Sequence, residues 1–198
     1  MSFLKKIKEL FEKPESHVSD GDWFYHTKTF SRKLLQFYKK VQREVNNDSA
    51  LKTGQNIIVE GLSFDDNTNS VIKKWGNPRC TFKTIKERNV VHVFFYRRDY
   101  IYENTLLQLQ FFNNQLFFIG IEVGKNLMTS DNKINMLSKF LPNFITNGYE
   151  NTESIPVWMD TNQNFLLVDD DVSLNICYLC GKQLENDIHA LSQFVENK

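Results

Sequence analysis

The chain has 198 residues, of which 41% are hydrophobic and 17 are phenylalanine, enough to fill the core of one domain of ordinary size, so wholesale disorder is not expected. Lysine plus arginine equals aspartate plus glutamate at 24 each. A duplex-binding domain needs a basic excess to displace counterions from phosphates, so the balance predicts no nucleic-acid partner, with local basic patches left open.

The first element expected along the chain is an amphipathic helix at residues 2–13, ended by Pro14. Its apolar residues recur at helical spacing opposite three lysines: they are Phe3, Leu4, Ile7, Leu10 and Phe11. Such a helix docks on its own domain or contacts an anionic membrane surface. A second helix is expected from about residue 28 to residue 45, with an apolar stripe formed by Phe30, Leu34, Phe37, Tyr38, Val41 and Val45.

The N-terminus has no uninterrupted apolar segment of the kind that starts a secretory signal, and no window reaches the roughly 18 apolar residues of a membrane span. The three cysteines are too few for a disulfide framework. The sequence therefore predicts a cytoplasmic protein. Its expected organisation is an N-terminal helix at 1–14 and a single domain at 15–198, with 28–124 and 131–198 as an alternative subdivision.

A short strand is expected at residues 56–60, followed by a helix that Ser63 or Asp65 caps and that runs through Trp75. Gly76 is then expected just past the helix end. Further helices are expected near 131–140 and 184–196.

Seven strands are expected after this helix, at about 79–87, 90–97, 105–112, 115–123, 156–159, 165–168 and 172–179. Asn113 and Asn114 suit a two-residue hairpin turn because asparagine tolerates positive φ. Apolar residues alternate with glutamines in 105–112, which predicts one buried sheet face. The expected fold is α+β: an antiparallel sheet, made of a four-strand meander and about three further strands, packed against helices on one face.

An ordered series of motifs runs through residues 56–124. It comprises Asp65 through Trp75-Gly76-Asn77-Pro78, Phe94-Phe95-Tyr96, Leu107-Gln108-Leu109-Gln110-Phe111, and Asn113-Asn114-Gln115-Leu116 with Ile119. This series resembles the pattern of the β-lactamase-inhibitor-like and SmpA/OmlA-like modules. The resemblance covers about a third of the chain, and it implies a small α+β binding module that is generally non-catalytic.

Catalytic and metal-binding patterns are weak throughout. Cys177 and Cys180 have C-x-x-C spacing, but they lie in an apolar strand pattern without a second pair, which favours packing in the core over a zinc site. Two segments that begin like calcium loops, at Asp65 and Asp160, lack the glycine and glutamate that such loops need. No histidine stands in a recognisable relation to a nucleophile. The sequence therefore predicts no catalytic residue, no cofactor and no metal, and it favours a protein that is not an enzyme.

Two segments are candidate binding surfaces for another protein. The first is an arginine and tyrosine cluster, because these side chains supply contact area and directional hydrogen bonds; the second is an acidic turn. The residues are Arg97, Arg98, Tyr100 and Tyr102 in the first and Asp169, Asp170 and Asp171 in the second.

The predicted function is a non-catalytic protein-binding domain, in its most specific form an inhibitor or immunity-type protein that covers a partner's active site. One alternative is a small-molecule-binding or enzymatic domain with a dispersed site. The other is a peripheral membrane or scaffold protein that uses residues 2–13. The sequence leaves the oligomeric state open.

Overall fold

The computed structural model describes residues 34, 36–59, 61–86, 88–98, 105–123, 157–169 and 174–182. They form one eight-stranded sheet, a helix at 36–46 and the helix α3 (Thr68–Trp75). The predicted α+β class is confirmed. The predicted helices at 2–13, 131–140 and 184–196 lie outside the described residues.

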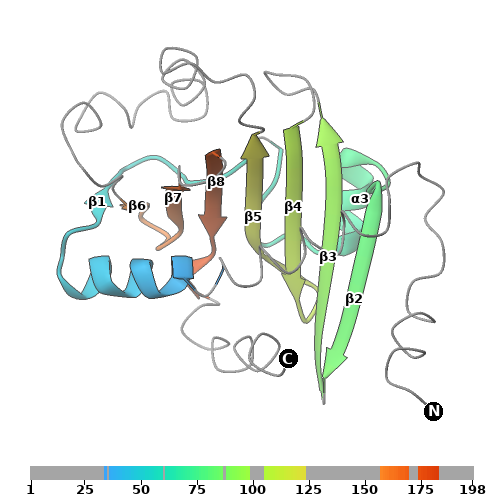
Figure 1. The fold of residues 1–198 in the computed structure, drawn as a ribbon, viewed down its shortest axis with the longest axis horizontal. Helices are drawn as coiled ribbons and strands as arrows, with labels where there is room; N and C mark the ends of the chain where they lie inside the picture. Colours follow the sequence, from blue (N-terminus) through green and yellow to red (C-terminus); the bar gives the residue numbers. More distant parts are fainter. Residues whose placement is uncertain are drawn as a thin grey trace.

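The sheet combines two antiparallel meanders, and its strand order is β1-β6-β7-β8-β5-β4-β3-β2 (Figure 1). The strands are β1 (Leu51–Lys52), β2 (Cys80–Lys86), β3 (Asn89–Arg98), β4 (Thr105–Phe112), β5 (Gln115–Val123), β6 (Val157–Met159), β7 (Phe165–Asp169) and β8 (Leu174–Leu179). Strands β2–β5 are the predicted four-strand meander, and β6–β8 are the three further strands. β5 pairs with β8, so both parts of the chain share one sheet. The pair β1–β6 is parallel, and every other neighbouring pair is antiparallel.

The turn between β4 and β5 has the predicted form, with φ of 47° at Asn113 and 69° at Asn114. Both asparagine side chains also bind neighbouring elements. The Oδ1 atom of Asn113 accepts a 2.9 Å bond from the Val90 N–H, and that of Asn114 accepts a 2.7 Å bond from the Thr68 hydroxyl. The turn therefore fixes the ends of β3 and α3 against the β4–β5 hairpin.

The helix α3 begins later than predicted, because Asn67 is its N-cap in place of Ser63 or Asp65. Asn67 Oδ1 accepts a 2.9 Å bond from the Ser70 N–H, and Ser70 Oγ accepts a bond from the Asn67 N–H. This reciprocal pair satisfies two N–H groups at the helix start. The end of the helix is as predicted, at Gly76 with a φ of 80°.

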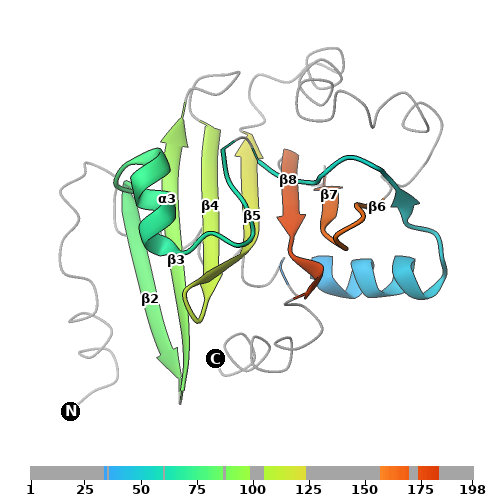
Figure 2. The same ribbon diagram turned by 180° about the vertical axis from the view of Figure 1, so that it is seen from behind.

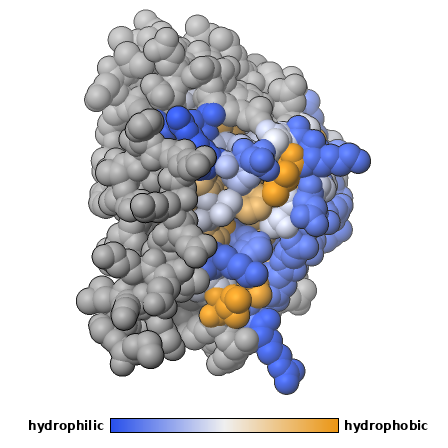
Figure 3. Space-filling model, turned by 90° about the vertical axis from the view of Figure 1, so that its right-hand side faces the viewer, coloured by the Kyte–Doolittle hydropathy of each residue, from blue (hydrophilic) through white to orange (hydrophobic). Residues whose placement is uncertain are grey.

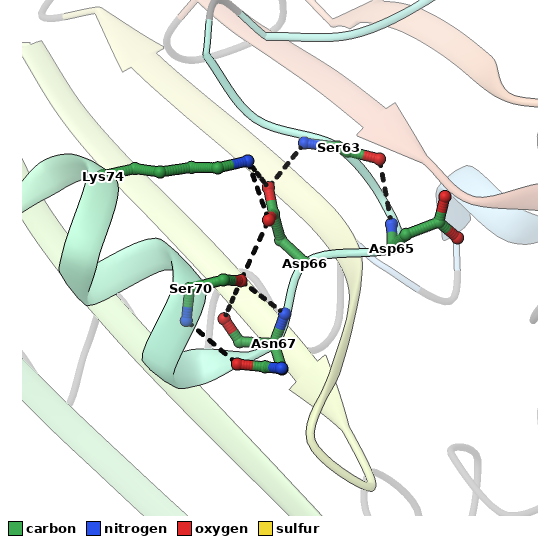
Figure 4. Close-up of polar contacts among 6 residues, drawn as sticks. All are labelled: Ser63, Asp65, Asp66, Asn67, Ser70 and Lys74. Carbon is green, nitrogen blue, oxygen red and sulfur yellow. Dashed lines mark hydrogen bonds and ion pairs between the residues drawn. The ribbon is translucent and has the colours of Figure 1, made fainter.

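A buried carboxylate, Asp66, explains why the chain does not enter the helix earlier. It accepts bonds from the Ser63 N–H at 2.8 Å and from Ser70 Oγ at 2.9 Å, and Lys74 Nζ lies 2.7 Å from Oδ2 (Figure 4). Asp66 thus holds residues 63–66 in a turn against the first and last turns of α3.

The predicted strand at 56–60 is wrong. Ile57 and Val59 are buried and Ile58 is exposed, as a strand would have them, but residues 53–59 form no ladder. The Ile57 N–H instead donates a 2.8 Å bond to Oδ2 of Asp160. The alternation of apolar residues therefore indicated correctly which side chains are buried. The hydrogen bond that a neighbouring strand would have accepted is accepted by the Asp160 carboxylate.

Helix α3 covers the sheet over β2 and β3, on the side turned away from the viewer in Figure 1 and toward the viewer in Figure 2. Trp75 packs edge-on against Tyr96, with ring centroids 5.6 Å apart, and the Tyr96 hydroxyl donates a 3.1 Å bond to the Gly76 carbonyl. The helix at 36–46 lies beside β6–β8 and buries most of the predicted stripe, but its last member, Val45, is exposed. The prediction that all helices share one sheet face stays a prediction.

The centre of the sheet is buried on both faces, where the alternation in β4 predicted one. Every residue of β4 and β8 is buried. Gln108 is 0% exposed and Gln110 is 4% exposed. The face opposite α3 is therefore an interior surface that carries polar side chains.

Candidate functional site

The strand register places one residue of each sequence-predicted patch, Arg97 and Asp169, on one face of the sheet. Residues that pair directly across neighbouring strands point to the same face. One row of such partners consists of Arg97 in β3, Leu106 in β4, Glu122 in β5, Asn175 in β8 and Asp169 in β7. Neighbouring strands lie about 4.8 Å apart, so the four steps from Arg97 to Asp169 span about 19 Å. The row carries a positive residue at one end and a negative residue at the other.

Of the other predicted binding residues, the structure describes one, Arg98. Arg98 is the last residue of β3 and pairs with Thr105. Tyr100, Tyr102, Asp170 and Asp171 lie outside the described residues. The structure therefore brings Arg97 and Asp169 onto one face and leaves both predicted loops untested.

The two glutamines of β4 lie on the same face of the sheet as this row. We call this face the glutamine face, and it carries Arg97, Leu106, Gln108, Gln110, Gly120, Glu122, Asn175 and Asp169. Gln108 pairs with Phe95 on one side and with Gly120 on the other, and Gly120 pairs with Cys177. Gly120 adds no side chain to this second row. A glycine inside a strand often marks a place where a ligand or another backbone approaches closely.

Several buried polar atoms of the glutamine face have no hydrogen-bond partner among the described residues. They are both side-chain atoms of Gln108 (Nε2 and Oε1), Nε2 of Gln110 and Nε of Arg97. Burying an amide without a partner costs roughly 1–3 kcal/mol in proteins, and nearly all buried polar groups are paired for this reason. Alternation of glutamine with leucine could not reveal this group, because the same pattern is typical of a strand with one exposed face.

All three cysteines are buried, which confirms the interpretation of Cys177 and Cys180 as core residues. Within the described part of the chain, no three histidine, cysteine, aspartate or glutamate side chains form a group that could hold a metal ion. The segment at Asp160 is a turn between β6 and β7, in which the Asp160 carboxylate accepts bonds from the protein's own N–H groups.

The free edge of the sheet is a second candidate surface. Among the described residues, β2 has β3 as its single neighbour, and Thr81, Lys83, Thr84 and Ile85 are exposed. The described residues that are visible on this side are largely hydrophilic, with smaller hydrophobic areas (Figure 3). Residues 73–98 hold eight basic residues against one acidic residue, Glu87; the basic ones are Lys73, Lys74, Arg79, Lys83, Lys86, Arg88, Arg97 and Arg98.

No family model matches the chain, and neither the curated proteins nor the solved structures include a match. The resemblance to the β-lactamase-inhibitor-like and SmpA/OmlA-like modules thus stays a prediction. None of the helices in the described residues has the length and apolar composition to cross a membrane.

Proposed function

We propose that the protein is a non-catalytic protein-binding domain and that its binding surface is the edge strand β2 with the basic residues around it. The observation that carries this proposal is the seven-residue strand β2, which ends the sheet among the described residues and in which Thr81, Lys83, Thr84 and Ile85 are exposed. An edge strand presents backbone N–H and C=O groups with which an extended segment of another chain can pair. Such pairing supplies affinity through the main chain and specificity through alternate side chains.

The charge around β2 indicates the kind of partner. Eight basic residues against one acidic residue within 73–98 favour an acidic partner segment, since complementary charge speeds encounter and disfavours wrong partners. The most specific form of this proposal is a cytoplasmic inhibitor that covers a partner's active site. Both the inhibitor role and the cytoplasmic location are expectations from the sequence.

The proposal is tested by reversing one charge on the exposed edge. The tagged full-length protein is used to isolate its partner from a lysate of the source organism, and the affinity for the purified partner is then measured for the wild type, Lys83→Glu and Lys39→Glu. Lys83 and Lys39 are both exposed, but Lys39 lies on the helix at 36–46, away from the edge. We expect Lys83→Glu to weaken binding about tenfold at low salt, which corresponds to about 1.4 kcal/mol, and Lys39→Glu to have no effect.

A partner that binds the Lys83→Glu variant as tightly as the wild type does not use the β2 edge. The Arg97→Glu/Arg98→Glu double variant tests the cluster predicted from the sequence in the same assay. Retained binding in this variant excludes that cluster as the interface. If no partner is recovered above background, the protein-binding proposal itself fails.

A further inference from the structure

The buried amides of β4 are the most unusual feature of the interior. Gln108 and Gln110 are two residues apart on one strand, so they point to the same face at a spacing of about 7 Å. Both atoms of the Gln108 amide and Nε2 of Gln110 are buried and have no partner among the described residues. For Gln108 this conclusion does not depend on which atom is oxygen and which is nitrogen, because both are unpaired.

The unpaired atoms are mostly donors. The two amide nitrogens supply up to four N–H groups, and Nε of Arg97 supplies one more, whereas Oε1 of Gln108 is the one unpaired acceptor of this group. Arg97 lies in the neighbouring row, directly opposite Leu106, which is two residues from Gln108 on β4. A molecule that satisfies this set therefore needs acceptor oxygens, and the permanent charge of arginine favours an anionic one.

The surroundings of these donors are apolar. Cys80, Val93, Phe95 and Leu106 form a buried cluster on the glutamine face, with Phe82 and Val91 packed against it. Phe95 pairs directly with Gln108, and on the other side Gln108 faces Gly120, which has no side chain. Apolar walls with a few polar groups that fix orientation are the usual composition of a small-molecule site.

We propose that the glutamine face binds a small carboxylate with a short apolar body. Its oxygens accept hydrogen bonds from Gln108, Gln110 and Arg97, and its apolar part packs against Phe95 and Leu106. Arg97 is the one residue that this site shares with the basic residues around β2, whereas Gln108 and Gln110 lie on β4. The glutamine variants below therefore test this site separately from the proposed protein-binding edge.

The test measures the thermal unfolding midpoint, Tm, of the full chain in sodium acetate, butyrate and hexanoate. Sodium chloride at equal concentration controls for ionic strength, and the alcohols of equal chain length control for the apolar body. We expect at least one carboxylate to raise Tm by roughly 5–10 °C at about 100 times its Kd, and the matching alcohol to have a much smaller effect.

Gln108→Met keeps the length of the side chain and removes its polar atoms. We expect this variant to lose the carboxylate effect and to have a higher Tm than the wild type without ligand, because the unpaired amide is gone. Gln36→Met is the matched control, since Gln36 is exposed on the helix at 36–46 and should keep the full response. Gln110→Met serves as a second variant if Gln108→Met does not unfold in one cooperative transition.

Three results would overturn the proposal: no carboxylate raises Tm above the chloride control, the glutamine variants respond like the wild type, or native mass spectrometry detects no carboxylate adduct. Ordered water alone at the site would appear as a lower Tm of Gln108→Met together with no carboxylate effect, which also overturns it.

Discussion

Asp160 gives the sharpest prediction about stability, because its carboxylate joins distant parts of the chain. It is 3% exposed. Oδ1 accepts 2.8 Å bonds from the Asn162 and Asn164 N–H groups, and Oδ2 accepts a 2.8 Å bond from the Ile57 N–H and a 3.1 Å bond from Asn164 Nδ2. The carboxylate thus organises the β6–β7 turn and also holds the segment at 53–59 in place of a strand ladder.

The change Asp160→Asn keeps the size of the side chain and removes half of these acceptors. The new amide can keep its oxygen toward Asn162 and Asn164, but its NH₂ group then faces two donors, the Ile57 N–H and Asn164 Nδ2. Hydrogen bonds to a charged group contribute about 1.5–3 kcal/mol each, so two lost bonds predict a destabilisation of about 3–6 kcal/mol. Domains are stable by about 5–15 kcal/mol, so this loss removes a large part of the total.

Urea unfolding of both proteins, followed by tryptophan fluorescence, measures this difference. Asp48→Asn is the matched control: the Asp48 side chain is 82% exposed and its partner is the exposed Lys52, so its urea midpoint should match that of the wild type. A loss below about 1 kcal/mol for Asp160→Asn would refute the reasoning, because it would mean that the Ile57 N–H does not depend on this carboxylate.

Two further predictions concern pH. Burial alone would raise the pKa of Asp66, but hydrogen bonds led by that from Lys74 outweigh it and hold the pKa below the usual 3.8. The stability that Asp66 contributes is therefore present above about pH 4 and lost as the pH falls further, and Asp66→Asn should flatten the fall of the urea midpoint below pH 4. Burial, and then the charge of Lys83, lower the pKa of His92 below the usual 6.5. The folded protein thus resists protonation of His92, stability should fall as the pH drops through 6.5 and level off below the folded pKa, and His92→Gln should remove this slope.

The sequence predicted the sheet well because the β2–β5 meander is local. Strand β4 at 105–112 and strand β5 at 115–123 have the predicted bounds, since strict alternation and the Asn113–Asn114 turn define both ends. The errors occurred where side chains competed with the backbone for hydrogen bonds. Asn67 caps α3, because the Asp66 carboxylate stabilises the turn that precedes the helix. Asp160 accepts a hydrogen bond from the segment that was predicted as a strand at 56–60.

The candidate site was less accessible to sequence reasoning, because it depends on which strands become neighbours. Arg97 and Asp169 were each predicted as binding residues, but their common row follows from the pairing of β5 with β8. Gln108 and Gln110 had the spacing of an exposed face, and only the two-sided burial of β4 places them in the interior. Local alternation tells which residues share a face and does not tell whether that face is covered.

The net charge of the chain likewise does not show how charged residues are distributed over the sheet. The totals of 24 basic and 24 acidic residues cancel, which predicted no nucleic-acid partner and left local basic patches open. From residue 150 onward, however, the chain has nine acidic residues and two basic ones, and the fold places the described strands of this part, β6–β8, at the opposite side of the sheet from β2 and β3. Of these acidic residues, Asp169 lies at the end of β7, which is separated from β2 by β8, β5, β4 and β3. Screening over about 8 Å at physiological salt keeps charges from neutralising each other at a distance of several strands. An acidic segment that approaches the β2 edge thus meets a basic surface, although the protein as a whole is neutral.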